Sequence, residues 1–365
     1  MPIPERRFRI GHGLCEKRGA QKQYDVEGAP ALSDATPPTL ANTGTTPAPN
    51  ASDLTHSQVD RSPRKHPSPP PRPGRKSPAA TVLLAYLYDQ VQVLTEQDQH
   101  VRHDTSAPVH KMRISTRRLR SALATYRNLL DAEVVSHLRG ELKWFAGVLG
   151  KERDGQIMHQ RLNHMIAGEP TDLIPGPVSQ RIDEQLGANL HAAQLKTLDA
   201  LGDDRYFRLL NALDALLAAP PLTDLASDPA HRIVPDLIRK DWKRLRKAIN
   251  AAMITPAGVA HETAMHDVRK SAKRLRYAAE SAASLRGKRI VRLARSARRL
   301  QRILGDHQDS VVARDLLRRL GIEAHTRGEN GFGYGRLHAL EQAVATDSEA
   351  RFLRAWKNFP SIKSV

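Results

Sequence analysis

The chain has 365 residues, with 57 lysines and arginines against 39 aspartates and glutamates, which gives a formal net charge of +18 at pH 7. Its single cysteine, Cys15, excludes a disulfide framework, a thiolate zinc cage and an iron–sulfur cluster. Aromatic residues make up 4% of the chain, so stacking on nucleic-acid bases is not expected as the main mode of recognition. We see neither a signal peptide nor an apolar run of the roughly 18 residues that a membrane span needs. We therefore expect a cytoplasmic protein with an anionic partner and no membrane contact.

Residues 1–78 are predicted to form a disordered, proline-rich basic tail. They hold 14 of the 24 prolines and carry 12 basic against 7 acidic residues. Neither a strand period nor a helix period persists in them, so they cannot bury enough apolar surface to fold. The tail is interpreted as a solvated linker, and a basic arm that adds to anion binding is the alternative.

From residue 79 onwards, apolar residues recur with the period of a helix, and no alternating strand pattern is found. The body is therefore predicted to be all-α. Glycines and prolines, among them Gly150 and Gly305, are expected to end its helices. The predicted helices cover 79–100, 107–130, 133–149, 151–167, 176–200, 204–219, 232–253, 258–284, 287–304, 307–320, 333–346 and 348–357.

The body contains an internal repeat. His110–Arg120 aligns with His266–Arg276 at an offset of 156 residues and with six identities. Leu149–Asp154 aligns with Leu304–Asp309 at an offset of 155. Two features with nearly the same offset indicate a duplicated unit.

The duplication predicts an architecture. We divide the body into an N-terminal half, 79–225, and a C-terminal half, 226–360, each an antiparallel helical bundle. A pseudo-twofold axis is expected to relate the halves, with the basic helices 107–130 and 258–284 facing each other around a basic central groove.

Both repeated helices carry positive charge on the face opposite their apolar stripe. Runs of charge on helices are usually solvated faces, but these are of one sign and occur at matched positions, which favours a binding surface. Rows of guanidinium groups suit a polymer of phosphates better than one small anion. A third basic row follows on the next helix. The candidate binding residues are His110, Arg113, Arg117, Arg118, Arg120, His266, Arg269, Lys270, Lys273, Arg274, Arg276, Tyr277, Arg295, Arg299 and Arg302.

These residues resemble the CHAD family of histidine-bearing α-helical domains. The resemblance covers about residues 79–360 and rests on the two segments that begin at His110 and His266, with the Leu-Gly-x-x-x-Asp segments that end at Asp154 and Asp309. It implies a pair of helical bundles around a basic groove that binds inorganic polyphosphate, often on storage granules, without catalysis. The Glu-x-Glu-x-Lys motif of the triphosphate-tunnel (CYTH) domain is absent, so we expect a stand-alone CHAD member.

Two other functions stay open at this point, a nucleic-acid-binding protein and a magnesium-dependent polyphosphate hydrolase. Asp154 and Asp309 are interpreted as helix caps or as salt-bridge partners that orient an arginine, with a magnesium ligand as the alternative. His261 and His266 are five residues apart and turn about 140° from each other, so they do not form the metalloprotease pair. We expect no enzyme activity, metal or cofactor, and the oligomeric state is left open.

Overall fold

In the computed structural model of the protein, residues 67–101, 106–285 and 287–361 are described, and most of the predicted tail lies outside them. The described residues form nine α-helices, short 3-10 turns and two isolated β-bridges, and this confirms the all-α prediction. None of these helices combines the length and the apolar composition that crossing a bilayer requires. The helices are α1 (Ala79–Val101), α2 (Ser106–Thr125), α3 (Ala132–Ala167), α4 (Val178–Gly202), α5 (Asp204–Ala218), α6 (Ala230–Ile254), α7 (Val259–Ser281), α8 (Lys288–Thr326) and α9 (Phe332–Lys357).

Two predicted breaks are wrong, because α3 and α8 run uninterrupted through Gly150 and Gly305 for 36 and 39 residues. Similarly, α9 is one helix where two were expected. A glycine inside a helix costs only about 1 kcal/mol relative to alanine, and packing along a long helix outweighs this cost. The two glycines lie against Arg113 and Arg269 of the basic helices.

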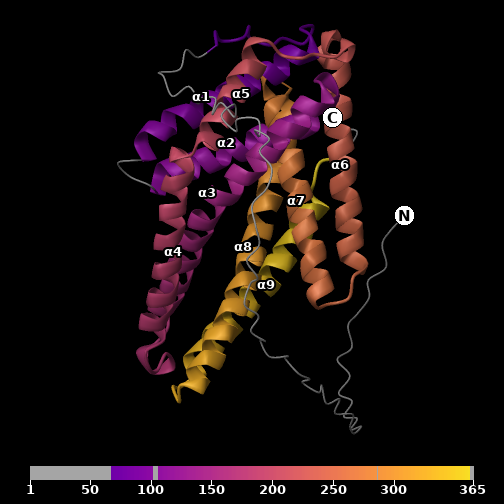
Figure 1. The fold of residues 1–365 in the computed structure, drawn as a ribbon. Coiled ribbons are helices and arrows are strands. Elements are labelled where there is room, and N and C mark those ends of the chain that lie inside the picture. The colour runs from indigo at the N-terminus through magenta and orange to yellow at the C-terminus, as the bar shows by residue number, and fades with distance from the viewer. Residues whose placement is uncertain (1–66, 102–105, 286, 362–365) are drawn as a thin grey trace, which may run out of the picture. The chain divides into compact units, whose positions relative to one another are not determined.

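The hydrophobic core does not follow the predicted division into halves. One cluster of buried side chains is built from α1, α2, α5, α6 and α7 with the first parts of α3 and α8. A second cluster joins the last parts of α3 and α8 to α4 and α9. In Figure 1, α3 with α4 and α8 with α9 extend downward as two long helix pairs. Both clusters therefore tie the N-terminal half to the C-terminal half.

The order in which neighbouring helices pack is the same in both halves. In the first half α1 packs on α2, α2 on α3, and α3 on α4; in the second half α6, α7, α8 and α9 repeat this order. Helix α5 has no counterpart. The predicted contact between the two basic helices is confirmed, because α2 packs against α7. The duplication itself stays a prediction, and reciprocal contacts support it.

The first reciprocal contact joins the starts of α1 and α6. The Ala79 N–H donates to the carbonyl of Asp228 at 2.8 Å, and the Ala230 N–H donates to the carbonyl of Ser77 at 2.8 Å. Ala230 lies 151 positions after Ala79, and Asp228 lies 151 positions after Ser77, so each chain segment makes the contact that the other makes. This exchange gives the register between α1 and α6, in which position 90 corresponds to position 241.

The end of the predicted tail differs from expectation. Residues 67–78 were expected to be disordered, but they run along the helical body and form a segment that we call the proline strap. Besides the Ser77 contact, Pro78 pairs with Pro229 in an isolated bridge, and the backbone N–H of His231 donates to the carbonyl of Arg75 at 3.2 Å. Partners for its backbone groups hold the strap in place, although its composition is that of a linker. The 3-10 turn η3 (Asp224–Ser227) lies at the predicted boundary between the halves, and that division stays a prediction.

Candidate anion-binding site

The apolar stripes of the two basic helices are buried, as the sequence predicts. The fully buried residues are Met112, Leu119 and Leu123 in α2 and Val268, Ala272 and Leu275 in α7. Their burial fixes the rotation of each helix. The opposite faces therefore turn their cations toward each other where α2 meets α7.

Four of these cations form what we call the central cluster: Arg113 and Arg117 from α2, and Arg269 and Lys273 from α7. Burial lowers the pKa of Lys273, and the charges of the three arginines lower it further, to about 6. Asp154 opposes this shift only in part. The cluster therefore holds more positive charge than its own carboxylates neutralise.

Asp154 forms an ion pair with an arginine of the cluster, as one interpretation of the sequence held, whereas Asp309 makes no ion pair within the described residues. The Nη2 atom of Arg113 donates to Oδ1 of Asp154 at 2.7 Å. Burial raises the pKa of Asp309, and the charge of Arg269 opposes that rise. Neither aspartate is a helix cap, because both lie inside the long helices α3 and α8. Within the described residues, no three histidine, cysteine, aspartate or glutamate side chains gather as metal ligands would.

The two helix-interior glycines lie directly against the cluster. A Cβ atom at Gly150 would be 3.8 Å from Nε of Arg113, and a Cβ atom at Gly305 would be 3.4 Å from Nη2 of Arg269. A side chain longer than that of alanine would compete with the guanidinium groups for this space. The glycines recur in both halves because each long helix passes close to one arginine.

Several donors in and around the cluster have no partner among the described residues. They are the buried Nε atoms of Arg113 and Arg269 and the buried Nδ1 atom of His110. Buried polar groups in proteins almost always have hydrogen-bond partners. Burial also lowers the pKa of His110 and His266, and nearby cations lower both further. An anionic ligand would supply acceptors to the donors and would favour protonation of the histidines.

Not every predicted residue belongs to the cluster. Arg118 and Arg276 both pair with Glu280, at 3.4 and 2.6 Å. Lys270 is exposed and pairs with Asp267 at 2.8 Å. The sequence identified these cations, but only the fold shows that Glu280 also reaches Arg118 on another helix; the other two pairs lie three or four residues apart in α7.

The remaining candidates lie around the cluster. His266 contacts Oε1 of Gln308 through Nδ1, and Tyr277 is buried beside Arg113 and Arg269. Arg295, Arg299 and Arg302 are exposed along the first half of α8 and make no ion pair within the described part of the chain. Arg120 and Arg274 lie outside the cluster. The charges of Arg117 and Arg139 act on Arg120, and Arg274 pairs with Asp241.

Two groups of cations are absent from the predicted set. Arg139 and Arg153 of α3 lie beside Arg120 and His110 respectively. Helix α6 carries seven lysines and arginines in 25 residues, five of them exposed between 240 and 247. The basic repeat does not extend to α6, because its counterpart α1 contains no lysine or arginine. A count of charge per helix would have found it.

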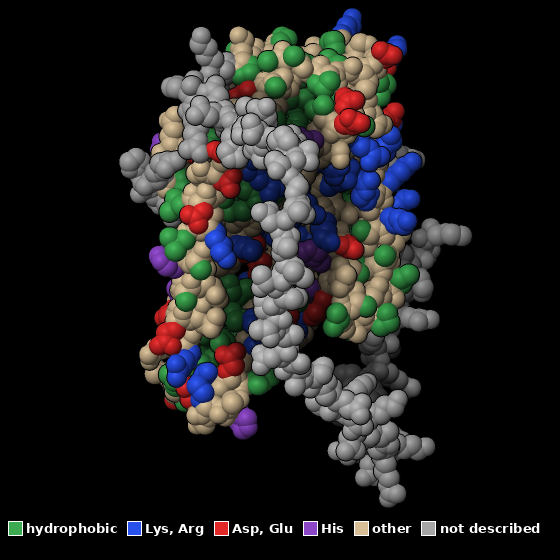
Figure 2. Space-filling model, in the orientation of Figure 1, with side chains coloured by type: hydrophobic (Ala, Val, Ile, Leu, Met, Phe, Trp, Pro, Cys, Tyr) green, Lys and Arg blue, Asp and Glu red, His purple; other side chains and the backbone are tan. Residues whose placement is uncertain are grey.

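The molecular surface agrees with this placement. Figure 2 shows a hollow between α3 and α4 on one side and α6 and α7 on the other, with Lys, Arg and His side chains inside it. A further group of Lys and Arg side chains covers the outer side of α6 at the edge of the same view.

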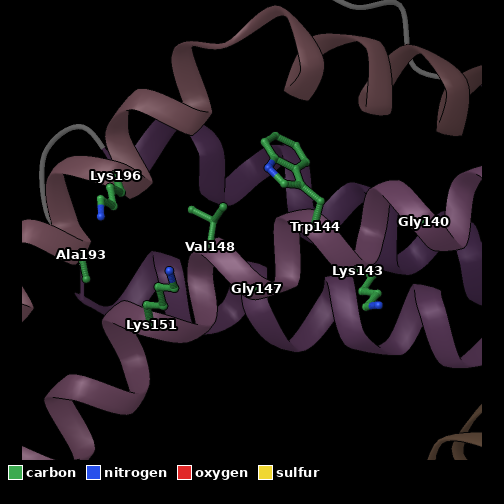
Figure 3. Close-up of a pocket in the computed structure, with 8 residues that line it drawn as sticks. All are labelled: Gly140, Lys143, Trp144, Gly147, Val148, Lys151, Ala193 and Lys196. Atoms are coloured by element: carbon green, nitrogen blue, oxygen red, sulfur yellow. The ribbon is translucent and has the colours of Figure 1, made fainter. Parts of the chain in front are cut away.

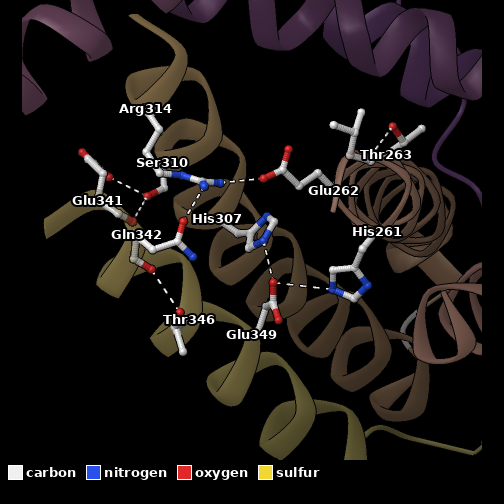
Figure 4. Close-up of polar contacts among 11 residues, drawn as sticks. His261, Glu262, Thr263, His307, Ser310, Arg314, Glu341, Gln342, Thr346 and Glu349 are labelled. Atoms are coloured by element: carbon white, nitrogen blue, oxygen red, sulfur yellow. Dashed lines mark hydrogen bonds and ion pairs between the residues drawn. The ribbon is translucent and has the colours of Figure 1, made fainter. Parts of the chain in front are cut away.

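Two other features are separate from the cluster. A cavity of about 480 Å³ between α3 and α4 is mostly apolar, with Lys143, Trp144 and Lys151 among its lining residues (Figure 3). The histidine pair that was considered for metal binding does not come together. Figure 4 shows that His261 instead contacts Glu349, which also bonds to His307 at 3.0 Å.

Comparison with known proteins places this geometry in a family. A profile of the CHAD domain matches residues 85–318. Two proteins of Mycobacterium tuberculosis, MT2285 of strain CDC 1551 and Rv2226 of strain H37Rv, are each 33% identical over 309 residues. The alignments cover 84% of this chain and 57% of each relative, so the chain spans a little over half of their length.

Two solved structures share the fold. PptA from Streptomyces chartreusis superposes with a TM-score of 0.64 at 24% identity, covering 77% of this chain and all of that one. The CHAD domain from the plant Ricinus communis superposes with a TM-score of 0.60 at 22% identity, covering 82% of this chain and 98% of that one.

Proposed function

Because this chain belongs to the CHAD domain family, we propose that it binds inorganic polyphosphate, without catalysis, through the central cluster. The resemblance of the sequence to the family suggests the ligand. The observation that carries the proposal is Lys273, a half-buried amine among three arginines drawn from both halves, with no hydrogen bond or ion pair of its own within the described residues.

The cost of this arrangement supports an anionic ligand. Like charges held together in a partly buried site destabilise the free protein unless an anion neutralises them. Arginine forks bind phosphate oxygens in pairs, and lysine adds a point charge. The single acidic partner of Arg113 leaves the other three cations of the cluster available to phosphate.

The experiment replaces all four cations of the cluster with alanine: Arg113→Ala, Arg117→Ala, Arg269→Ala and Lys273→Ala. We expect binding of long-chain polyphosphate, measured by isothermal titration calorimetry, to be lost while the helical circular dichroism is kept. A matched control removes four exposed charges elsewhere, in Arg318→Ala, Arg319→Ala, Arg354→Ala and Lys357→Ala. Normal binding by the cluster variant would contradict the proposal.

Two further measurements separate polyphosphate from the alternatives. Affinity should fall steeply with salt, as counterion release requires, but duplex DNA and RNA at equal phosphate concentration should compete weakly. Equal competition would favour a nucleic-acid-binding protein. Release of free phosphate from polyphosphate with Mg²⁺, abolished by Asp154→Asn and Asp309→Asn, would contradict the non-catalytic part of the proposal.

A further inference from the structure

A small basic pocket lies outside the central cluster, where the end of α2 meets α6 and α7. It holds about 50 Å³, little more than one small group. Its cations are Arg127, Lys240, Arg244 and Arg274, and its only acid is Asp241. We call it the Arg274 pocket.

The pocket is built around a buried ion pair. Nε of Arg274 lies 2.8 Å from Oδ1 of Asp241, whose side chain is 3% exposed, and Nη2 of Arg274 donates to the carbonyl of Ala124 at 3.2 Å. Arg244 pairs with the same carboxylate. Asp241 therefore fixes two arginines. Arg127 and Lys240 are exposed and have no ion pair within the described residues, so the pocket keeps surplus positive charge.

The first half contains a counterpart of this pocket. Arg118 matches Arg274 at the offset of 156, and Nη1 of Arg118 donates to Oε1 of Gln90 at 3.4 Å. Gln90 matches Asp241 in the register given by the start of α1 and α6. Nη2 of Arg118 reaches Glu280, the match of Ala124. The two arginines thus make reciprocal contacts across the α2–α7 interface, as a pseudo-twofold axis predicts.

The two pockets differ in charge. Asp89 takes the place of Lys240, Glu280 takes the place of Ala124, and Gln90 takes the place of Asp241. The counterpart therefore has two carboxylates where the Arg274 pocket has one, and it lacks the cation of Lys240. The proline strap also lines the counterpart, with Pro69, Pro70 and Pro73 forming part of its wall and Arg72 adding one cation. An anion that enters the Arg274 pocket meets cations, but in the counterpart it meets two carboxylates beside a covering segment.

A line of cations connects the central cluster to the Arg274 pocket. Arg120 follows Arg117 by about one turn of α2, so the two lie on the same side of that helix. Burial lowers the pKa of Arg120, and the charges of Arg117 and Arg139 lower it further. The charge of Arg139 also acts on Arg274. From the pocket the line continues over the exposed lysines and arginines of α6.

We propose that the Arg274 pocket is a second phosphate subsite, through which a long polyphosphate chain leaves the central cluster in one direction, toward α6. The proposal rests on the proposed function. Arg120 and Arg139 guide the chain, and Arg127 and Lys240 bind a phosphate group at the mouth of the pocket. The counterpart at Arg118 binds no phosphate. The protein therefore holds long chains more tightly than the cluster alone would.

The test removes the two exposed cations of the pocket and leaves the buried ion pair intact. Arg127→Ala with Lys240→Ala should weaken the affinity for long-chain polyphosphate about tenfold, and the affinity for inorganic triphosphate should change less than about twofold. Arg318→Ala with Arg319→Ala removes the same charge from the distal part of α8 and should change neither affinity by more than about twofold. Both are measured by titration calorimetry at fixed salt.

An unchanged affinity for long chains would overturn the inference, and so would an equal loss for both probes, because the pocket would then act only through the central cluster. These results differ from a failure of the proposed function. In that case the wild-type protein would not bind polyphosphate, or the four-alanine cluster variant would still bind it.

Discussion

Helices α1 and α6 occupy matched places at the outside of the two halves, and their charges are opposite. Helix α1 carries three acidic residues and no lysine or arginine, whereas α6 carries seven lysines and arginines against two aspartates. Each packs on a basic helix and contacts an arginine of that helix: Arg118 of α2 donates to Gln90 of α1, and Arg274 of α7 pairs with Asp241 of α6. The same backbone arrangement thus supports two different sides: a covered side at α1 and Arg118, and a cationic side at α6 and Arg274. This is possible because packing depends on the apolar face of each helix and leaves the charge of its outer face free to vary.

The largest difference between the two sides is expected in stability. Arg274→Met leaves the buried carboxylate of Asp241 with only the half-exposed Arg244 and Thr125, so the free energy of unfolding should fall by about 3 kcal/mol. Arg118→Met should cost about 1 kcal/mol or less, since Glu280 keeps Arg276. Urea unfolding at pH 7 measures both.

The Arg274→Met loss has a pH signature. Burial already raises the pKa of Asp241, and loss of the arginine raises it further. Below that pKa the protonated carboxyl needs no cation, so the loss should shrink as the pH falls through the raised pKa of Asp241. Equal losses for the two arginine variants, or a loss independent of pH, would break the comparison.

The next effect concerns Lys273, which belongs to neither side. Its pKa of about 6 lies below the ordinary value of 10.5, so between these values the unfolded chain binds more protons than the folded one. The stability of the free protein should therefore rise with pH across this window. Lys273→Met should raise the free energy of unfolding at pH 6 by about 1–3 kcal/mol, and this gain should vanish near pH 10. Thermal melts at several pH values measure it.

The same lysine should make polyphosphate binding depend on pH. A bound anion raises the pKa of Lys273 again, so above pH 6 binding takes up a proton and the affinity falls as the pH rises. Calorimetry in buffers of different ionisation enthalpy measures this uptake. In Lys273→Arg the cation stays charged, so the pH dependence should flatten. We expect any pH dependence that remains in Lys273→Arg to come from protonation of His110 and His266.

A smaller effect is expected from exchanging charge between the matched helices. Lys240→Asp copies the residue that α1 has at position 89, and it should weaken long-chain polyphosphate binding about tenfold. The reverse change, Asp89→Lys, should leave the affinity within about twofold, because Glu280 still neutralises Arg118. A gain from Asp89→Lys as large as the loss from Lys240→Asp would show that the two sides are equivalent. Filter binding with labelled long-chain polyphosphate measures the affinity of both variants.

The smallest effect concerns the matched glycines. Alanine has the higher helix propensity, so Gly150→Ala should raise the free energy of unfolding by about 0.5–1 kcal/mol. Gly305→Ala should gain less, because its methyl group would lie 3.4 Å from the guanidinium of Arg269, against 3.8 Å from Arg113 at Gly150. Denaturant unfolding of both variants compares them, and a larger gain for Gly305→Ala would contradict the close approach.

The sequence by itself determined the helices and the cations. Helical spacing of apolar residues located the buried stripes of α2 and α7, and the repeat correctly predicted that these helices pack together. It also located Arg113, Arg117, Arg269 and Lys273, because residues opposite a buried stripe must face outward from the core. Such patterns are local, and a single helix contains them in full.

Only the tertiary structure decided which cations remain available to a ligand. Arg118 and Arg276 share Glu280, and Arg274 shares Asp241, through contacts between residues 4 to 162 positions apart. The continuity of α3 and α8 through their glycines was decided in the same way, by two cores that draw on both halves. Burial, and the neutralisation of Arg118 and Arg274, depend on neighbours that folding brings from other helices. The order of residues along one helix encodes only pairs three or four positions apart, such as Arg276 with Glu280.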